Sequence, residues 1–322
     1  MVTLATSPPS RLRVVFFGTP DFAVPTLETL LRSRHVVAGV VTQPDRPRGR
    51  GRQLFDAPVK ARAAAAGVPI LQPQRLTDAS FLERLTALRP DLGVVAAYGK
   101  ILSDQVLAIP ARGFLNVHAS LLPRYRGAAP VHRAIIAGER ETGVTIMRVV
   151  QALDAGPMLA RAHRPIAAGE TSDEVERDLA RLGAALLVVT LDDLAAGRVQ
   201  ETPQDDSQAT YAHKLRKDEG LIDWRWTAER LHNLIRGLHP WPHAFTFLGA
   251  RRFIVRKSQW SAERSPEAAG TVVDAAGDRL AVAAGSGILE ITELQPEGKR
   301  PMSARDFLTG HPISSGARFG SS

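Results

Sequence analysis

Between residues 13 and 200 the sequence alternates short apolar runs with amphipathic segments. The apolar runs are rich in β-branched residues and nearly continuous in hydrophobicity, which is typical of strands buried on both faces. We expect these strands at residues 13–17, 36–41, 92–97, 114–119 and 144–150. We expect helices between and after them, at residues 21–33, 58–66, 78–89, 129–137 and 171–197. The alternation predicts an α/β fold with a doubly wound, mostly parallel sheet.

The pattern changes near residue 200. Residues 198–220 are polar and lack a sustained period, as a linker does. One helical segment follows at 227–239, and after it come short β-like runs separated by glycine turns. Such runs predict a small antiparallel barrel or sandwich. We therefore expect a first domain over residues 1–203, a linker over 204–220 and a second domain over 221–322.

The composition is that of an ordinary globular protein, with 322 residues, of which 44% are hydrophobic and 23% charged. The chain has no cysteine, which excludes disulfides, thiolate zinc sites and a cysteine nucleophile. No apolar run reaches the ~18 residues of a membrane span. The N-terminus lacks the residue order of a signal peptide. We expect a cytoplasmic protein that does not contact a membrane.

The net charge of +8 favours an anionic partner, although a compositional bias towards arginine explains it equally well. Local clustering is more informative than the total. Four arginines stand at alternate positions of "PDRPRGRGRQ": Arg46, Arg48, Arg50 and Arg52. Four like charges beside glycines suit a loop that attracts phosphates, and the alternative is a solvated loop without a partner.

The first strand is not followed by a nucleotide-binding loop. The segment "FFGTPDFAVPTL" contains the single glycine Gly18, whereas the dinucleotide fingerprint needs three. Phosphate-binding P-loop, HExxH and GxSxG motifs do not occur either. The histidines show no metal-ligand spacing with acids, so we expect no metal site. A nicotinamide-dependent dehydrogenase is therefore disfavoured.

Three polar residues could meet at one edge of the sheet. Asn116 and His118 are two positions apart at the end of an expected strand, so their side chains project from the same face. Asp154 follows the next strand, and ligands in open α/β sheets bind beyond the carboxyl ends of strands. An amide, an imidazole and a carboxylate suit acyl transfer to an amine. The alternative is a satisfied core histidine, a strand-end cap and an unrelated turn residue.

Longer segments carry a resemblance to a known family. These are "FFGTPDFAVPTLETLL", "VTQPDRPRGRGRQL", "NVHASLLPRYRGAAPVHRAIIAGERETGVTIM", "LDAGPML" and "LQPEGKRPMSARDFL". In this order they resemble the bacterial and organellar methionyl-tRNA formyltransferases, over nearly the whole chain. The third segment marks the wider family of enzymes that use formyltetrahydrofolate.

The resemblance implies formyl transfer from 10-formyltetrahydrofolate to the α-amino group of methionyl initiator tRNA, with no metal. It assigns catalysis to Asn116, His118 and Asp154. It assigns the loop bearing the four arginines to the tRNA acceptor stem, and the C-terminal domain to an OB-like barrel that binds tRNA. It assigns folate contacts to one short segment: Ser120, Leu121, Leu122 and Pro123. We also expect a monomer.

Three other interpretations stay open at this point. A formyltransferase acting on a small amine, such as a sugar nucleotide, would need neither the arginine loop nor the barrel. A non-catalytic RNA-binding protein would bind RNA without folate-dependent chemistry, and a folate hydrolase would release formate. The functions of Arg124 and Arg126 are undecided between substrate contact and anchoring of their loop.

Overall fold

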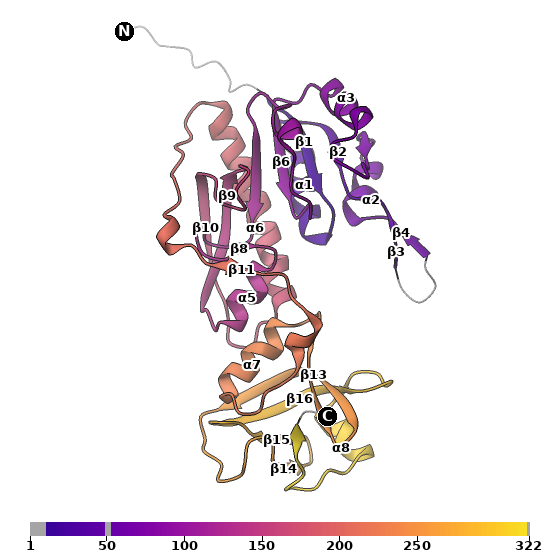
Figure 1. The fold of residues 1–322 in the computed structure, drawn as a ribbon, viewed down its shortest axis with the longest axis vertical. Coiled ribbons are helices and arrows are strands. Elements are labelled where there is room, and N and C mark those ends of the chain that lie inside the picture. Colours follow the sequence, from indigo (N-terminus) through magenta and orange to yellow (C-terminus); the bar gives the residue numbers. More distant parts are fainter. Residues whose placement is uncertain (1–10, 49–52, 321–322) are drawn as a thin grey trace. The chain divides into compact units, whose positions relative to one another are not determined.

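The computed structural model describes residues 11–48 and 53–320, and the chain divides into two compact units (Figure 1). The first unit contains Met1–Ala128, Gly143–Arg164 and Glu176–Tyr211. The second contains Ala129–Thr142, Pro165–Val175 and Ala212–Ser322. Among the described residues, no helix is both long enough and apolar enough to cross a membrane.

The first unit is built on a sheet with the strand order β10-β9-β7-β6-β1-β2-β5. Its strands are β1 (Arg13–Gly18), β2 (Val36–Val41), β5 (Ile70–Leu71), β6 (Leu92–Ala96), β7 (Phe114–His118), β9 (Glu141–Arg148) and β10 (Met158–Pro165). β1 pairs in parallel with β2 on one side and with β6 on the other, and β6 pairs in parallel with β7. The prediction of a doubly wound, mostly parallel sheet is therefore confirmed.

The apolar runs are buried as their composition predicted. Val14, Val15, Phe16 and Phe17 of β1 point alternately to the two faces of the sheet, and all four are inaccessible to solvent. Helices therefore cover both faces. They are α1 (Val24–Arg32), preceded by the 3-10 helix η1 (Asp21–Ala23), with α2 (Pro58–Ala65), α3 (Ala79–Ala87), α4 (Asp104–Leu107) and α6 (Ser172–Ala195).

The first turn of helix α6 is capped by side-chain contacts. The backbone N–H and the hydroxyl of Thr171 both donate to the carboxylate of Glu174, at 2.8 and 2.6 Å. Further along, a Cβ on Gly183 would lie 2.6 Å from Val117 and 3.1 Å from Val144. The glycine therefore lets α6 approach β7 and β9 closely.

Two features of this sheet differ from the sequence-based expectation. β9 runs antiparallel to β7, with Leu115 opposite Arg148 and His118 opposite Thr145. β10 was not predicted, because "MLARAHRP" is an edge strand whose exposed arginine and histidine interrupt any apolar run.

Two short pairings lie outside the main sheet. β3 (Arg46–Arg48) pairs antiparallel with β4 (Gln53–Phe55), so the described backbone on the two sides of residues 49–52 is paired. The side chains of Arg46 and Arg48, and all of Arg50 and Arg52, lie outside the described residues. The second pairing joins β8 (Arg126–Gly127) to β11 (Tyr211–Ala212), and the 3-10 helix η2 (Asp206–Gln208) precedes β11.

The second unit contains a curled antiparallel sheet, in agreement with the OB-like domain that was predicted (Figure 1). Its strand order is β14-β15-β16-β13-β12-β18, and β17 pairs with β16. The strands are β12 (Ala244–Leu248), β13 (Arg251–Ser261), β14 (Val272–Ala276), β15 (Arg279–Ala283), β16 (Ile288–Pro296), β17 (Met302–Ser303) and β18 (Phe319–Gly320). The helices are α5 (Pro130–Ile136), η3 (Lys217–Gly220), α7 (Ala228–Gly237) and α8 (Ala304–Gly310).

Candidate active site

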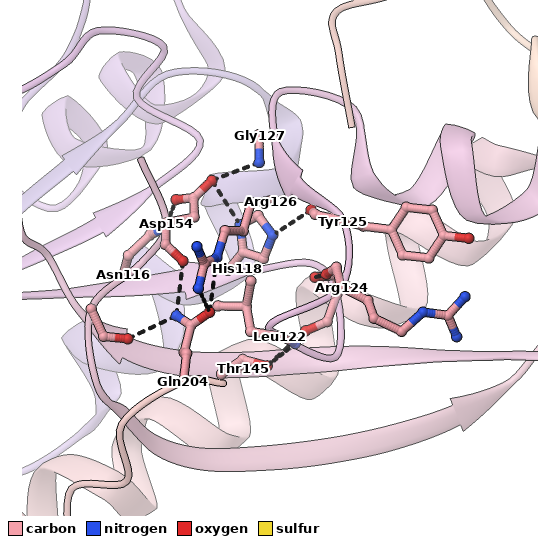
Figure 2. Close-up of polar contacts among 12 residues, drawn as sticks. Asn116, His118, Leu122, Arg124, Tyr125, Arg126, Gly127, Thr145, Asp154 and Gln204 are labelled. Atoms are coloured by element: carbon pink, nitrogen blue, oxygen red, sulfur yellow. Dashed lines mark hydrogen bonds and ion pairs between the residues drawn. The ribbon is translucent and has the colours of Figure 1, made fainter. Parts of the chain in front are cut away.

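The end of β7 brings two of the predicted polar residues to one carboxylate (Figure 2). Asn116 Nδ2 lies 3.5 Å from Asp154 Oδ1, and His118 Nδ1 lies 3.6 Å from Asp154 Oδ2. Both contacts are longer than a well-formed hydrogen bond, so neither side chain is locked to the carboxylate. The structure therefore groups an amide, an imidazole and a carboxylate on one face of the strand.

Asp154 reaches this place by a different path from the one predicted. Because β9 is antiparallel to β7, the carboxyl end of β9 lies beside the start of β7 rather than beside His118. The loop after β9 folds back to bring Asp154 against Asn116 and His118. Gly156 permits this fold, since a Cβ there would lie 2.0 Å from the carbonyl oxygen of Arg148.

The Asp154 carboxylate is held by a backbone donor. The N–H of Gly127 donates to Asp154 Oδ2 at 2.8 Å. Asp154 itself adopts φ +48°, in the left-handed region that residues other than glycine adopt uncommonly. The surrounding contacts must therefore stabilise this backbone conformation, as is common at functional sites.

His118 is held on its other nitrogen. Its side chain is only 6% exposed, and Nε2 lies 3.0 Å from the backbone carbonyl oxygen of Tyr125. A carbonyl can only accept, so Nε2 carries a proton in this arrangement. Nδ1 is left facing Asp154, which fixes both the tilt of the ring and the nitrogen presented to the carboxylate.

The segment predicted to contact folate is largely used inside the protein. Ser120 donates its hydroxyl to the carbonyl oxygen of Arg124 at 2.6 Å, and the Leu122 side chain is fully buried. Thr145 joins the segment to β9, because its hydroxyl donates to Ser120 O at 2.7 Å and accepts from Leu122 N–H at 3.2 Å. Leu121 and Pro123 are half-buried, and contact of this segment with folate stays a prediction.

The two arginines of the same loop have different environments. Arg124 is exposed, and its guanidinium lies 5.3 Å from the centre of the Tyr125 ring. Arg126 is buried, with a side chain 4% exposed that bonds to Gln204. The sequence had not pointed to Gln204, Gly127 or Thr145, because a lone glutamine, glycine or threonine has no distinctive pattern.

The site therefore offers a hydrogen-bond donor, a proton-transfer group and a carboxylate within one residue cluster. An amide can donate to an oxygen that gains negative charge, and an imidazole with a carboxylate can move protons near neutral pH. In the described part of the chain, no three His, Asp or Glu side chains gather as metal ligands.

Comparison with known proteins identifies the family. Residues 12–191 match the family described as Formyl transferase, and residues 214–312 match its C-terminal domain. The chain is 47% identical to the methionyl-tRNA formyltransferase of Moorella thermoacetica over 309 residues, which cover 96% of this chain and 99% of that protein. It is 48% identical to the methionyl-tRNA formyltransferase of Methylococcus capsulatus, with 96% and 100% covered.

A solved structure shares the fold. The crystal structure of an N-formyltransferase from Helicobacter canadensis, in complex with folinic acid and dTDP-3-aminofucose, superimposes with a TM-score of 0.66. The two sequences are only 17% identical, and the match covers 87% of this chain and 99% of that one. The likeness to relatives near 47% identity decides the assignment, because it extends over nearly the full length of both proteins. The chain belongs to the methionyl-tRNA formyltransferase family.

Proposed function

We propose that the chain transfers the formyl group of 10-formyltetrahydrofolate to the α-amino group of methionyl initiator tRNA, for translation initiation. Relatives named for the tRNA reaction match it at 47–48% identity across both units. The observation that carries the mechanism is the meeting of Asn116 and His118 at the Asp154 carboxylate, at 3.5 and 3.6 Å.

The reaction is an acyl transfer between two nitrogens. The neutral α-amine attacks the formyl carbon, and the electron pair of the C=O bond moves to the oxygen. The Asn116 amide donates a hydrogen bond to this oxygen, and protonated His118 adds a positive charge beside it. Asp154 holds His118 and accepts the proton that the amine loses. When the bond to folate N10 breaks, N10 takes up a proton and tetrahydrofolate leaves.

The remaining assignments concern the substrates and the assembly. The arginine loop, with Arg46, Arg48, Arg50 and Arg52, meets the phosphates of the tRNA acceptor stem, and the C-terminal unit binds the tRNA further along. Ser120, Leu121, Leu122 and Pro123 turn the chain around the folate. The enzyme works as a monomer in the cytoplasm, where its aminoacylated substrate is made. We expect size-exclusion chromatography with light scattering to give the mass of one chain.

A competition between acceptors tests the proposed reaction. Labelled 10-formyltetrahydrofolate is offered with methionyl initiator tRNA, with methionyl elongator tRNA, or with an amino-sugar nucleotide. We expect label on the initiator tRNA, and little on the other two. Label on the sugar nucleotide alone, or release of labelled formate without any acceptor, would contradict the proposal and identify one of the alternative activities.

A further inference from the structure

We propose that Gln204, oriented by Arg126, is a positioning residue that fixes the loop carrying the Asp154 carboxylate. This inference rests on the proposed function, because it takes that carboxylate to act in formyl transfer. The Gln204 side-chain amide donates from Nε2 to the carbonyl oxygens of Asp154 and Gly156, each at 2.8 Å (Figure 2). One side chain therefore holds two carbonyls of the loop, from 50 residues further along the chain.

The orientation of the Gln204 amide is fixed by the chemistry of its partners. Its Oε1 accepts from Arg126 Nε at 3.0 Å and from Arg126 Nη2 at 2.8 Å. A guanidinium can only donate, and a backbone carbonyl can only accept. The amide group has one orientation that satisfies both sides, with oxygen towards Arg126 and nitrogen towards the loop. A charged donor on Oε1 also strengthens the two bonds that Nε2 makes.

Arg126 is itself held in place. Its backbone N–H donates to the carbonyl oxygen of Thr210 at 2.8 Å, within the pairing of β8 with β11. Its guanidinium also contacts Asp206 Oδ1 at 2.7 Å, but the Asp206 side chain is 82% exposed. An ion pair with so exposed a carboxylate contributes little, so the buried contact with Gln204 is the one that matters structurally.

The two neighbours Arg126 and Gly127 hold the same residue at two points. Gly127 binds the Asp154 carboxylate directly, and Arg126 binds the Asp154 backbone through Gln204. These bonds help to hold the backbone of Asp154 at φ +48°, a conformation that residues other than glycine adopt uncommonly. Without the Gln204 bonds we expect the loop to relax and the carboxylate to move. A misplacement of about 1 Å at a catalytic group can cost roughly 10²-fold in rate.

The discriminating variant is Gln204→Glu. A carboxylate in place of the amide keeps an acceptor for Arg126 but removes both donors to the loop. Gln208→Glu is the matched control, because it makes the same chemical change on an exposed side chain, which donates to Asp205. We expect Gln204→Glu to lower kcat at least about tenfold, with the KM for folate within roughly twofold of the wild type. We expect Gln208→Glu to leave both values unchanged.

The amide proton of Gly127 reports the position of the carboxylate without reference to activity. Its NMR resonance senses the bond to Asp154 Oδ2. We expect the resonance to move in Asp154→Asn and to move in the same direction in Gln204→Glu, but not in Gln208→Glu. If Gln204→Glu does not fold, Gln204→Asn takes its place, since its shorter amide cannot span from Arg126 to both carbonyls.

The outcomes separate this inference from the proposed function. Suppose that Asp154→Asn is slow, but that Gln204→Glu has the same kcat and the same Gly127 resonance as Gln208→Glu. This result would overturn the positioning role of Gln204. Wild-type turnover in Asp154→Asn would instead contradict the proposed mechanism. In that case the Gly127 resonance alone decides whether Gln204 positions the carboxylate: a resonance that moves supports the role, and one that stays contradicts it.

Discussion

The backbone N–H of Gly127 donates to the Asp154 carboxylate at 2.8 Å, although the two residues are 27 positions apart in the sequence. The oxygen that accepts this bond, Oδ2, is also the one nearest to His118 Nδ1, at 3.6 Å. One carboxylate oxygen is therefore shared between a fixed backbone donor and the imidazole. The other oxygen, Oδ1, faces Asn116 at 3.5 Å.

Asp154→Asn tests the charge of that carboxylate with little change of shape. An amide still accepts from Gly127, but it cannot hold a protonated His118 or take a proton from the amine. We expect the rate constant of a single turnover to fall by roughly 10²-fold or more, measured with saturating substrates. Asp178→Asn changes a half-exposed surface carboxylate paired with Arg164 and serves as the control. Equal rates for the two variants would show that the Asp154 charge is not used.

Gly156→Ala tests the close approach that folds the loop over the end of β9. The new Cβ would lie 2.0 Å from Arg148 O, a backbone atom, so the loop must shift. We expect slower turnover and a loss of stability of about 1–3 kcal/mol, measured by urea unfolding. Gly169→Ala is the control, because a Cβ there meets nothing within 4 Å. Similar values for both alanine variants would mean that the close approach at Gly156 is not needed.

The arginine loop is tested by reversing Arg46 and Arg48 together. Fewer phosphate contacts should raise the KM for tRNA and flatten its dependence on salt, while folate affinity is unchanged. The control reverses Arg32 and Arg181, whose side chains are 72% and 71% exposed, and changes the net charge by the same amount. If both pairs weaken tRNA use equally, overall charge rather than the loop is responsible.

His243 makes the stability of the second unit depend on pH. Burial, followed by the charges of Arg256 and His239, lowers the pKa of His243 from 6.5 to about 4. As the pH falls below 6.5, the His243 ring binds a proton in the unfolded chain but stays neutral in the folded chain, which favours unfolding. We therefore expect the free energy of unfolding to decrease between pH 6.5 and about 4, by on the order of 3 kcal/mol from this group.

Thermal unfolding followed across this pH range measures the effect. His243→Asn removes the titrating ring that lies 3.5 Å from Arg256 Nη1, so we expect a shallower decrease than in the wild type. An unchanged slope would assign the acid sensitivity to the other buried histidines of this unit, His232 and His239, whose pKa values burial also lowers.

The strands and helices with strong periodicity were predictable from the sequence. The expected strand at 36–41 matches β2, and the expected helices over 58–66 and 171–197 match α2 and α6 to within two residues at each end. Continuous β-branched runs and amphipathic periods depend on neighbouring residues only, so the tertiary structure preserves the elements that they predict. The edge strand β10 lacks such a signal, because half-exposed strands tolerate charged residues.

The site was predictable only in part. Side chains alternate between the two faces of a strand, so the spacing of Asn116 and His118 predicted that they share a face of β7. The antiparallel direction of β9 was not predicted, because it depends on pairing between segments that are distant in the sequence. Asp154 was expected at the right place by an argument that assumed parallel strands. Gln204 had no signal at all, since its contacts depend on a chain reversal that brings residue 204 back to residue 154.

The most direct test of the account is a double-mutant cycle on His118 and Asp154. Single-turnover formylation of methionyl initiator tRNA is measured for His118→Ala, Asp154→Asn and the double variant. If the two residues act as one unit, each single change should cost roughly 10²-fold or more, and the double variant should be little slower than the worse single one. Losses that multiply in the double variant, or near-normal rates in either single variant, would contradict the account.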